Sequence, residues 1–200
     1  MSSKIIPIGI SNRHIHLSQQ DLFALFGENY ELTNLKDLSQ PGEFAAEETV
    51  TIIGPKGQIS KVRVLGPVRK ATQLEISKTD SILLGISAPI RMSGDLIGTP
   101  GIEIIGPKGS IKLNQGVIIA KRHIHMSPKD ARIFGVKDRE VVWVKTSGER
   151  ALIFDQVVIR VSEKFHLEMH LDIDEANAAG LRNGDRVELL PLKLRELQLA

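Results

Sequence analysis

Short sequence patterns recur in this chain, and this internal repetition constrains its fold more than any other feature. Residues 9–21 resemble residues 119–130, because each segment runs from an apolar stretch through Arg-His-Ile-His to a serine. Ser18 and Ser127 are suited to begin a helix, since a serine hydroxyl can accept a hydrogen bond from an amide of the first turn. Pro128 fits the first turn of the second helix. Each copy therefore predicts a strand that leads into a short helix.

Two further repeats predict hairpins and helix ends. Residues 50–57 and 102–109 each end a β-branched run with Gly-Pro-Lys-Gly, a turn sequence that is followed by another alternating run. Segments 79–86, 129–136 and 174–181 are typical of short helices that end in glycine, which suits the left-handed conformation found there. Many short strands separated by short helices are typical of small barrels. The sequence therefore predicts a mainly β fold, with two small β-barrel domains capped by short α-helices.

The repeats do not occur in the same order in the two halves of the chain. A simple tandem duplication would keep that order. We therefore predict that the two barrels are interleaved in sequence, with the N-terminal strand completing the C-terminal barrel.

Composition narrows the function classes. Two hundred residues can bury a substantial core, and the formal net charge is only +2, with no long run of basic residues. A nucleic-acid binder would carry a basic footprint, so no nucleic-acid partner is predicted. Cysteine is absent, which excludes disulfides, cysteine-based zinc sites and a thiol nucleophile in the protein. Neither a signal peptide nor a membrane-spanning stretch is apparent, so we expect a cytoplasmic protein with no membrane partner.

The six histidines are concentrated in three short motifs. His14 and His16 form one pair, and His123 and His125 form another. Side chains two residues apart on a strand point to the same face, so each pair can present two nitrogens to one metal ion. Alternatively, backbone carbonyls satisfy these imidazoles at half-buried strand ends. Because both copies share the preceding arginine and the serine that follows, metal binding is favoured, with either two ions or one ion held by four imidazoles.

The third histidine motif, residues 165–171, alternates apolar residues with His166, Glu168 and His170, and Asp172 continues the alternation. A period of two predicts a strand, unlike the helical His-Glu-x-x-His motif of zinc proteases. One of the two histidines is expected to complete a three-histidine site. His170 is the better candidate because it lies where the strand turns into the next predicted helix, and His166 is then structural.

Two other segments carry candidate binding residues. Gly66 and Pro67 end a strand, and Arg69 and Glu75 follow it. Taken alone, Arg69 and Glu75 are best interpreted as a surface ion pair, which would contribute little stability. A carboxylate can nevertheless complete a two-histidine site, and arginine near a metal pair is the usual partner of phosphate. Residues 88–101 are rich in glycine and proline, which predicts an ordered loop that either wraps a ligand or connects barrel strands.

Together these motifs resemble the PduL-type phosphotransacylases, or phosphate propanoyltransferases. The resemblance extends over residues 8–190. It rests on Arg-His-Ile-His twice, Gly-Pro-Val-Arg-Lys-Ala-Thr-Gln-Leu-Glu at 66–75, Pro-Ile-Arg-Met-Ser-Gly-Asp at 89–95 and His-Leu-Glu-Met-His-Leu-Asp at 166–172. Each pattern alone is weak, but the ordered set is specific. It implies an enzyme that exchanges a short acyl group between coenzyme A and inorganic phosphate (acyl-CoA + phosphate = acyl phosphate + CoA).

The resemblance also implies a dinuclear zinc site. The residues implied for the first ion, which keeps a position open for the coenzyme A sulfur, are His14, His16 and Glu75. The residues implied for the second ion, which is completed by water or phosphate, are His123, His125 and His170. As an implied ligand, Glu75 no longer fits the interpretation as part of a surface ion pair, and Arg69 matches the family's active-site arginine. The residues that align with coenzyme A contacts of the family are Ser11, Lys36, Arg63, Leu65 and Asn177.

The same resemblance implies a central barrel at residues 13–121 and a second barrel made of residues 1–12 and 122–200. A homodimer is expected from the family. Members that enter bacterial microcompartments carry an N-terminal amphipathic extension, whereas here the first strand is predicted within a few residues of Met1. We therefore expect a free cytoplasmic enzyme that serves acetate metabolism, and the expectation of a propanoyl substrate is weakened.

Direct transfer in a ternary complex is the predicted mechanism, because the chain has no cysteine and its serines lack an identifiable base once the histidines bind metal. Two alternatives remain open. One is a dinuclear zinc hydrolase of a thioester or phosphoester, and the other is a non-catalytic ligand-binding barrel with a structural metal. Phosphate-dependent release of coenzyme A would distinguish transfer from hydrolysis, and a non-catalytic barrel would have no turnover to lose when zinc is removed.

Overall fold

The computed structural model describes residues 4–190 and is mainly β, as the sequence predicts. Its strands and four short helices divide between two compact units. One unit is made of Met1–Ser11 and Lys121–Ala200, and the other is Asn12–Ala120. Positions 1–3 and 191–200 of the predicted second domain lie outside the described residues.

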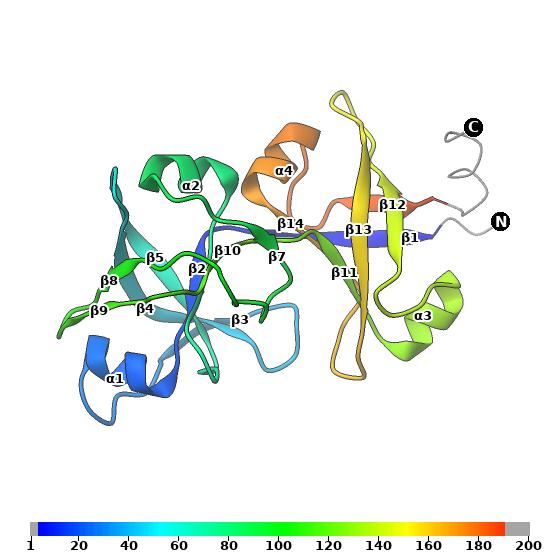
Figure 1. The fold of residues 1–200 in the computed structure, drawn as a ribbon. Helices are drawn as coiled ribbons and strands as arrows, with labels where there is room; N and C mark the ends of the chain where they lie inside the picture. Colours follow the sequence, from blue (N-terminus) through cyan, green and yellow to red (C-terminus); the bar gives the residue numbers. More distant parts are fainter. Residues whose placement is uncertain (1–3, 191–200) are drawn as a thin grey trace. The chain divides into compact units, whose positions relative to one another are not determined.

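The unit that contains the C-terminal part of the chain is a closed barrel in the order β1-β14-β11-β13-β12-β15. Its strands are β1 (Ile5–Ser11), β11 (His123–Met126), β12 (Val141–Lys145), β13 (Ile153–Val161), β14 (Glu168–Asp172) and β15 (Arg186–Leu189), and its helices are α3 (Pro128–Phe134) and α4 (Ile173–Ala179). The blue β1 lies among the yellow to red strands (Figure 1), parallel to β14 and antiparallel to β15. The N-terminal strand is therefore part of the barrel formed by the C-terminal segments.

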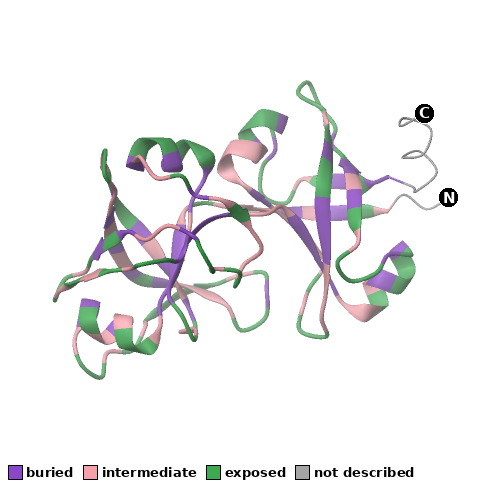
Figure 2. Cartoon of the chain, in the orientation of Figure 1, coloured by how far each residue is buried: buried purple, intermediate pink, exposed green. Residues whose placement is uncertain are grey.

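Apolar side chains at alternate positions of the strands fill the interior of this barrel, because every second side chain of a strand points to the same face. Ile6 and Ile8 of β1 are buried, as is Met169 of the neighbouring β14. They share one core cluster with Val142 and Val144 of β12, and these strands carry alternating purple segments in Figure 2. Burying each such side chain contributes roughly 1.5–3 kcal/mol relative to leaving it exposed.

The second unit is one sheet in the order β7-β10-β6-β2-β5-β4-β8-β9, with β3 paired to β4. Its strands are β2 (His14–His16), β3 (Asn34–Asp37), β4 (Phe44–Ile53), β5 (Gln58–Gly66), β6 (Gln73–Glu75), β7 (Ile90–Arg91), β8 (Glu103–Ile105), β9 (Ser110–Lys112) and β10 (Val117–Ala120), and its helices are α1 (Gln19–Phe26) and α2 (Lys78–Leu84). A separate core cluster, which includes Ile15, Val64 and Leu74, holds this unit together.

The two sheets differ in closure. Within residues 4–190, the ladder of the second unit ends at β7 and β9, so this sheet is a half-barrel rather than a closed ring. The two edge strands are only two and three residues long. Such short edges offer few unpaired backbone groups to another strand. The predicted mainly β class and its short helices are confirmed, with one barrel closed and one open.

The two Gly-Pro-Lys-Gly turns form the predicted hairpins. The amide of Gly54 donates to the carbonyl of Gly57 at 2.9 Å, between β4 and β5. The amide of Gly106 donates to the carbonyl of Gly109 at the same distance, between β8 and β9. Local turn chemistry therefore locates both hairpins.

The predicted helix ends are confirmed as well. Ser18 and Ser127 are N-caps whose side chains accept hydrogen bonds from first-turn amides. Gly85, Gly135 and Gly180 end their helices in the left-handed conformation, with φ of 71°, 63° and 66°. In the part of the chain that the structure describes, none of the helices is both long and apolar enough to cross a membrane.

One predicted strand begins later than the sequence suggests. The alternation from residue 165 continues a strand pattern, but β14 starts at Glu168. The amide of Phe165 donates to the carbonyl of Ser162 at 3.1 Å, so the chain is still turning there. His166 consequently lies before the strand, and its side chain is exposed. From Glu168 onward the predicted alternation is confirmed, and His170 lies within the strand.

Candidate metal centres

The structure gathers six of the predicted site residues into two groups of three. The first group is His14, His16 and Glu75 in the half-barrel unit, and the second is His123, His125 and His170 in the closed barrel. In each group, one candidate ligand atom from each residue lies within 4.8 Å of the others. Each group therefore has the composition and spacing of a three-ligand metal site.

The β-ladders explain why these residues meet. The two histidines of each pair lie two residues apart on a short strand and share one face. On the antiparallel neighbour, Glu75 of β6 lies directly opposite His14, and His170 of β14 lies directly opposite His123. Directly opposed residues in an antiparallel pair have Cβ atoms about 4.5–5.5 Å apart. Strand register thus adds the third side chain to each pair.

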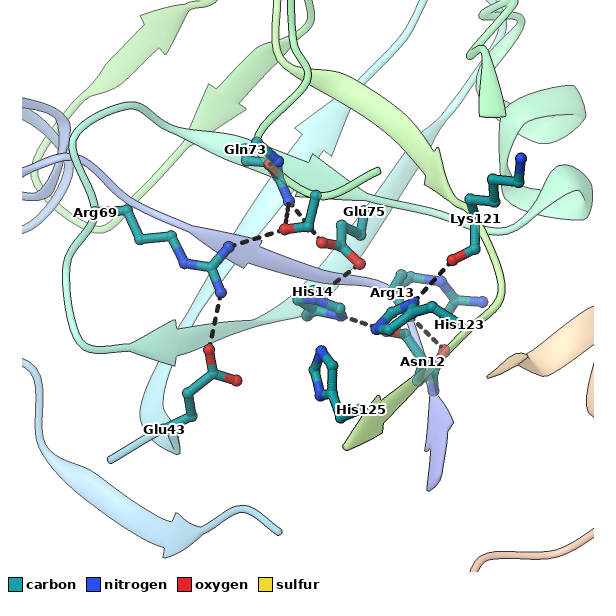
Figure 3. A network of polar contacts seen from close by, with 12 residues as sticks. Asn12, Arg13, His14, Glu43, Arg69, Gln73, Glu75, Lys121, His123 and His125 are labelled. Atoms are coloured by element: carbon teal, nitrogen blue, oxygen red, sulfur yellow. Dashed lines mark hydrogen bonds and ion pairs between the residues drawn. The ribbon is translucent and has the colours of Figure 1, made fainter. Parts of the chain in front are cut away.

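The first imidazole of each pair is oriented in the same way. Nδ1 of His14 lies 2.8 Å from the carbonyl of Asn12, and Nδ1 of His123 lies 2.8 Å from the carbonyl of Lys121 (Figure 3). A carbonyl can only accept, so each Nδ1 carries the proton and Nε2 keeps its lone pair. The carbonyl interpretation considered for these histidines therefore accounts for one ring nitrogen and leaves the other available to a metal.

Three other imidazole nitrogens are buried without a hydrogen-bond partner among residues 4–190. They are Nδ1 of His16, Nδ1 of His125 and Nε2 of His170. Buried polar atoms nearly always have a partner, and leaving one unsatisfied costs roughly 1–3 kcal/mol. Both groups contain such an atom, and Nε2 of His170 also lies 2.9 Å from Oε2 of Glu168. A bound cation would satisfy these lone pairs, so the side chains fit a metal ion.

Burial keeps the imidazoles of His16, His123 and His125 neutral. It lowers the pKa of His16 to about 2, and the neighbouring His14 and Arg69 lower it further. Burial and the neighbouring His170 lower the pKa of His123 to about 3. Burial, followed by the neighbouring histidines, lowers the pKa of His125 to about 2. Neutral imidazole is the form that binds metal ions, so these rings need not lose a proton before binding.

Arg69 and Glu75 do not behave as a surface ion pair, so that interpretation is wrong. Only 11% of the Glu75 side chain is exposed, and its Oε2 lies 3.5 Å from Nε2 of His14. Arg69 pairs with Glu43 at 3.1 Å and donates to the hydroxyl of Ser93 at 3.1 Å (Figure 3). The glycine- and proline-rich loop, which contributes Ser93, thus supports Arg69.

Comparison with known proteins identifies the family. The phosphate propanoyltransferase family matches residues 7–182 of the chain. The chain belongs to this family.

Curated relatives agree along nearly the whole chain. A phosphate propanoyltransferase of Thermotoga maritima is 63% identical over 186 residues, which cover 92% of this chain and 89% of the relative. The phosphate propanoyltransferase of Priestia megaterium is 57% identical, with coverage of 92% and 84%. That of Clostridioides difficile is 55% identical, with coverage of 92% and 88%. The chain is therefore an acyltransferase of the phosphate propanoyltransferase family.

The residues predicted to contact coenzyme A lie in two places. In the half-barrel unit, Lys36 of β3 and Leu65 of β5 pair with the same residue of β4, Ala45, from opposite sides. Arg63 of β5 donates to the carbonyls of residues 46 and 47 at 2.9 and 2.8 Å. In the closed barrel, Ser11 pairs with Asp172, which caps α4, and exposed Asn177 lies on that helix. Their role in this chain stays a prediction.

Sequence reasoning missed the role of the arginine before each histidine pair. Nε of Arg13 donates to both carboxylate oxygens of Asp80 at 2.9 Å, and Arg122 pairs with Glu175 at 2.7 Å. Asp80 completes the capping box of α2, which follows the strand that carries Glu75. Glu175 completes that of α4, which follows the strand that carries His170. Each arginine thus ties the histidine strand to that helix. The available signal was the repeated arginine together with a capping-box pattern at residues 77–80 and 172–175.

Proposed function

We propose that this member of the phosphate propanoyltransferase family exchanges a short acyl group between coenzyme A and inorganic phosphate, by direct transfer at two zinc ions. Family membership supports the reaction class. The observation that carries the metal part is the presence of two three-residue groups that each contain a buried imidazole nitrogen without a hydrogen-bond partner. Such groups leave at least one coordination position open, as catalytic zinc sites do.

The two groups would hold one ion each. His14, His16 and Glu75 form the group proposed for the ion beside the coenzyme A sulfur, and the three histidines of the closed barrel form the other. When bound, zinc ions hold a thiol as thiolate at neutral pH and polarise carbonyl and phosphoryl oxygens. Glu75 gives the first group a negative charge, whereas the second group consists of imidazoles alone. This difference suits the groups to different ligands.

Arg69 is the residue proposed to bind phosphate. About a third of its side chain is exposed, so the guanidinium can reach a ligand, while Ser93 and Glu43 hold its two Nη atoms. A planar guanidinium matches the oxygen geometry of phosphate and stays charged at every physiological pH. Arg69 would therefore orient phosphate as the nucleophile and neutralise it as the leaving group.

The proposed transfer needs no covalent acyl-enzyme. In the direction of acyl-CoA synthesis, the coenzyme A sulfur attacks the acyl carbon of the acyl phosphate. A carbon–sulfur bond forms, the carbon–oxygen bond to phosphate breaks, and phosphate leaves beside Arg69. In reverse, a phosphate oxygen attacks the thioester carbon and the thiolate leaves. The chain lacks cysteine, and its metal-binding imidazoles could not also serve as a general base for serine.

Metal content per chain, measured together with phosphate-dependent release of coenzyme A from acetyl-CoA and propanoyl-CoA, tests this proposal. We expect two zinc ions per chain and release that requires phosphate. Release without phosphate would instead support a hydrolase. Binding of two zinc ions per chain without any release of coenzyme A would support a non-catalytic barrel. A trapped acyl-enzyme, or ping-pong kinetics, would contradict direct transfer.

The same proposal includes coenzyme A binding by the residues predicted for it, a cytoplasmic location and a homodimer. Binding of coenzyme A to variants of Lys36 and Arg63 tests the first element. Sedimentation of the intact chain and fractionation of its host cells test the other two.

A further inference from the structure

The two ladders correspond beyond the metal-binding residues themselves. On β6, Gln73 lies directly opposite His16. On β14, Glu168 lies directly opposite His125. Gln73 and Glu168 therefore hold equivalent positions, each two residues before the third member of its group and on the same face of its strand.

Both side chains contact that third member. Nε2 of Gln73 donates to Oε1 of Glu75 at 2.5 Å (Figure 3). Oε2 of Glu168 lies 2.9 Å from Nε2 of His170, although not in hydrogen-bond geometry. A carboxylate at this distance favours positive charge at or beside the ring, as a metal cation would supply. Each third member is thus supported by a neighbour on its own strand.

The contacts of Gln73 with Glu75 and of Glu168 with His170 are both largely shielded from solvent. Gln73 is 2% exposed, and the side chain of Glu168 is 15% exposed. Gln73 is also fixed by Ser93, whose Oγ lies 2.8 Å from its Nε2, and by the amide of Gly94, which donates to its Oε1 at 2.7 Å. Buried polar side chains of this kind hold a ligand in one orientation because they have few alternatives.

The two groups are balanced in charge, because the half-barrel unit has glutamine at the position where the closed barrel has glutamate. In the half-barrel unit, the third member is a carboxylate and its neighbour Gln73 is neutral. In the closed barrel, the third member, His170, is an imidazole and its neighbour Glu168 is a carboxylate. Counted with these neighbours, each group contains two histidines of the repeated motif and one carboxylate. A divalent cation would therefore meet one nearby negative charge in either unit.

Gly9 provides the room for the Glu168 carboxylate. It lies on β1 directly opposite His170. A Cβ atom at Gly9 would approach Cδ of Glu168 to 2.7 Å and both carboxylate oxygens to 3.0 Å. Gly9 does not adopt a positive φ, so its backbone conformation does not require glycine. The small residue instead fits the close approach of the Glu168 side chain.

We propose that Glu168 is a positioning residue of the three-histidine group, which orients His170 and supplies the carboxylate that the group itself lacks. Gln73 performs the orienting part of this role for Glu75. Glu168 acts through His170, since it contacts that ring. This inference rests on the metal centres of the proposed function, because it assigns a role at one of them.

Zinc binding by metal-free protein tests the inference without relying on turnover. A chelator competition titration is performed on the full-length protein and on Glu168→Gln, Glu168→Asp and Gly9→Ala. Glu149→Gln is the matched control, since it removes the same charge from an exposed position of the same unit. We expect two binding events in the wild type. In Glu168→Gln one event weakens by about 10- to 100-fold and the other is unchanged.

Two more variants separate positioning from a purely structural role. Glu168→Asp keeps the charge and should recover part of the lost affinity, whereas Gly9→Ala displaces the carboxylate and should weaken the same event. The melting temperature of each metal-free variant should match the wild type, since the effect lies in metal binding. If Glu168→Gln and Gly9→Ala both bind two ions as tightly as the wild type, the positioning role is wrong. If the wild type itself binds no zinc, the metal centres of the proposed function fail first.

Discussion

The two candidate metal-binding groups agree in their strand pairing and differ in the side chains that surround them. In both, the third member lies opposite the first histidine, and the first imidazole donates to a carbonyl two residues earlier. The parallel neighbours differ, with Arg63 opposite His14 but Val158 opposite His123. Arg160 lies opposite His125 and approaches its Nε2 to 3.4 Å. The same three-residue arrangement therefore has a different electrostatic environment in each unit.

The pairing of β1 and β10 explains why the repeats follow a different order in the two halves. β1 precedes the first histidine pair, yet it pairs with β14, which carries His170. β10 precedes the second pair, yet it pairs with β6, which carries Glu75. Each copy of the repeat is thus divided between the two units. A duplicated ladder whose lead-in strands are exchanged would produce this order.

The largest expected effect is the loss of a histidine. His14→Ala and His123→Ala each remove one proposed ligand, so we expect each to lower turnover by more than about 100-fold, beyond the 10- to 100-fold typical of residues that only support a ligand. His166→Ala is the control, because His166 is exposed and lies outside both groups. The measurement is phosphate-dependent release of coenzyme A alongside zinc content. Full activity of His14→Ala or of His123→Ala would show that turnover needs only one of the two groups.

Acid should destabilise the metal-free closed barrel more than the half-barrel. The pKa of His16 is lowered to about 2 in one unit, and those of His123 and His125 are lowered to about 3 and 2 in the other. Between these values and the ordinary 6.5, the unfolded chain takes up protons that the folded chain does not. The stability these rings contribute is therefore present above pH 6.5 and is lost progressively as the pH falls toward 3.

Urea denaturation of metal-free protein at several pH values between 7 and 5 measures this loss. Native-state hydrogen exchange assigns it to a unit, because amides of β11 and β13 report on the closed barrel and those of β4 and β5 on the half-barrel. Zinc-saturated protein is the reference. Equal acid sensitivity of the two units would contradict the difference in their number of buried neutral rings.

Arg69→Gln should act on phosphate alone. Removing a hydrogen bond to a charged group costs about 1.5–3 kcal/mol, so we expect the KM for phosphate to rise by roughly 10- to 100-fold while coenzyme A binding and zinc content stay unchanged. Arg139→Gln is the matched control, since 92% of the Arg139 side chain is exposed. Steady-state kinetics with each substrate varied in turn decide the outcome. An equal rise in both KM values would mean that Arg69 supports the fold of the site rather than phosphate.

Local features of this fold could be predicted from the sequence because they depend on neighbouring residues. The strands at His14–His16 and His123–Met126, the two glycine-bounded turns and the glycine-terminated helices all follow from spacing or turn chemistry. Strand register is not local. Glu75 reads as a surface residue in sequence, and only its pairing with His14 brings it into the group. The resemblance to a family supplied that residue, and the roles of the site residues and the domain boundaries stay predictions.

Non-local contacts also explain what was missed. Gln73 and Glu168 lie within recognised sequence patterns, but the patterns do not show their supporting contacts, which depend on strand pairing. The closure of a sheet depends likewise on which edge strands meet. The alternation before Glu168 suggested a longer strand because hydrophobic period alone does not detect a turn.

The smallest expected effect concerns the helices that follow the two histidine motifs. Ser18 of α1 and Ser127 of α3 each accept a hydrogen bond from the amide three residues on, at 3.1 Å. Replacing either serine with alanine should cost about 1 kcal/mol of stability. The amide of Ser127 donates to Asp130, which completes a capping box, whereas the amide of Ser18 donates to Oγ1 of Thr72 at 2.9 Å. The cap of α1 therefore depends on a distant segment and that of α3 does not.

Thr72→Val separates the two caps. It removes the partner of the Ser18 amide and a hydrogen bond to Asp21, so it should destabilise the half-barrel unit and leave protection of the α3 amides unchanged. Denaturant unfolding combined with hydrogen exchange measures both effects, and Ser147→Ala, at an exposed loop position, is the control. If Thr72→Val leaves α1 as well protected as before, the cap of α1 is as local as that of α3. The two copies would then share this feature as they share the histidine pair.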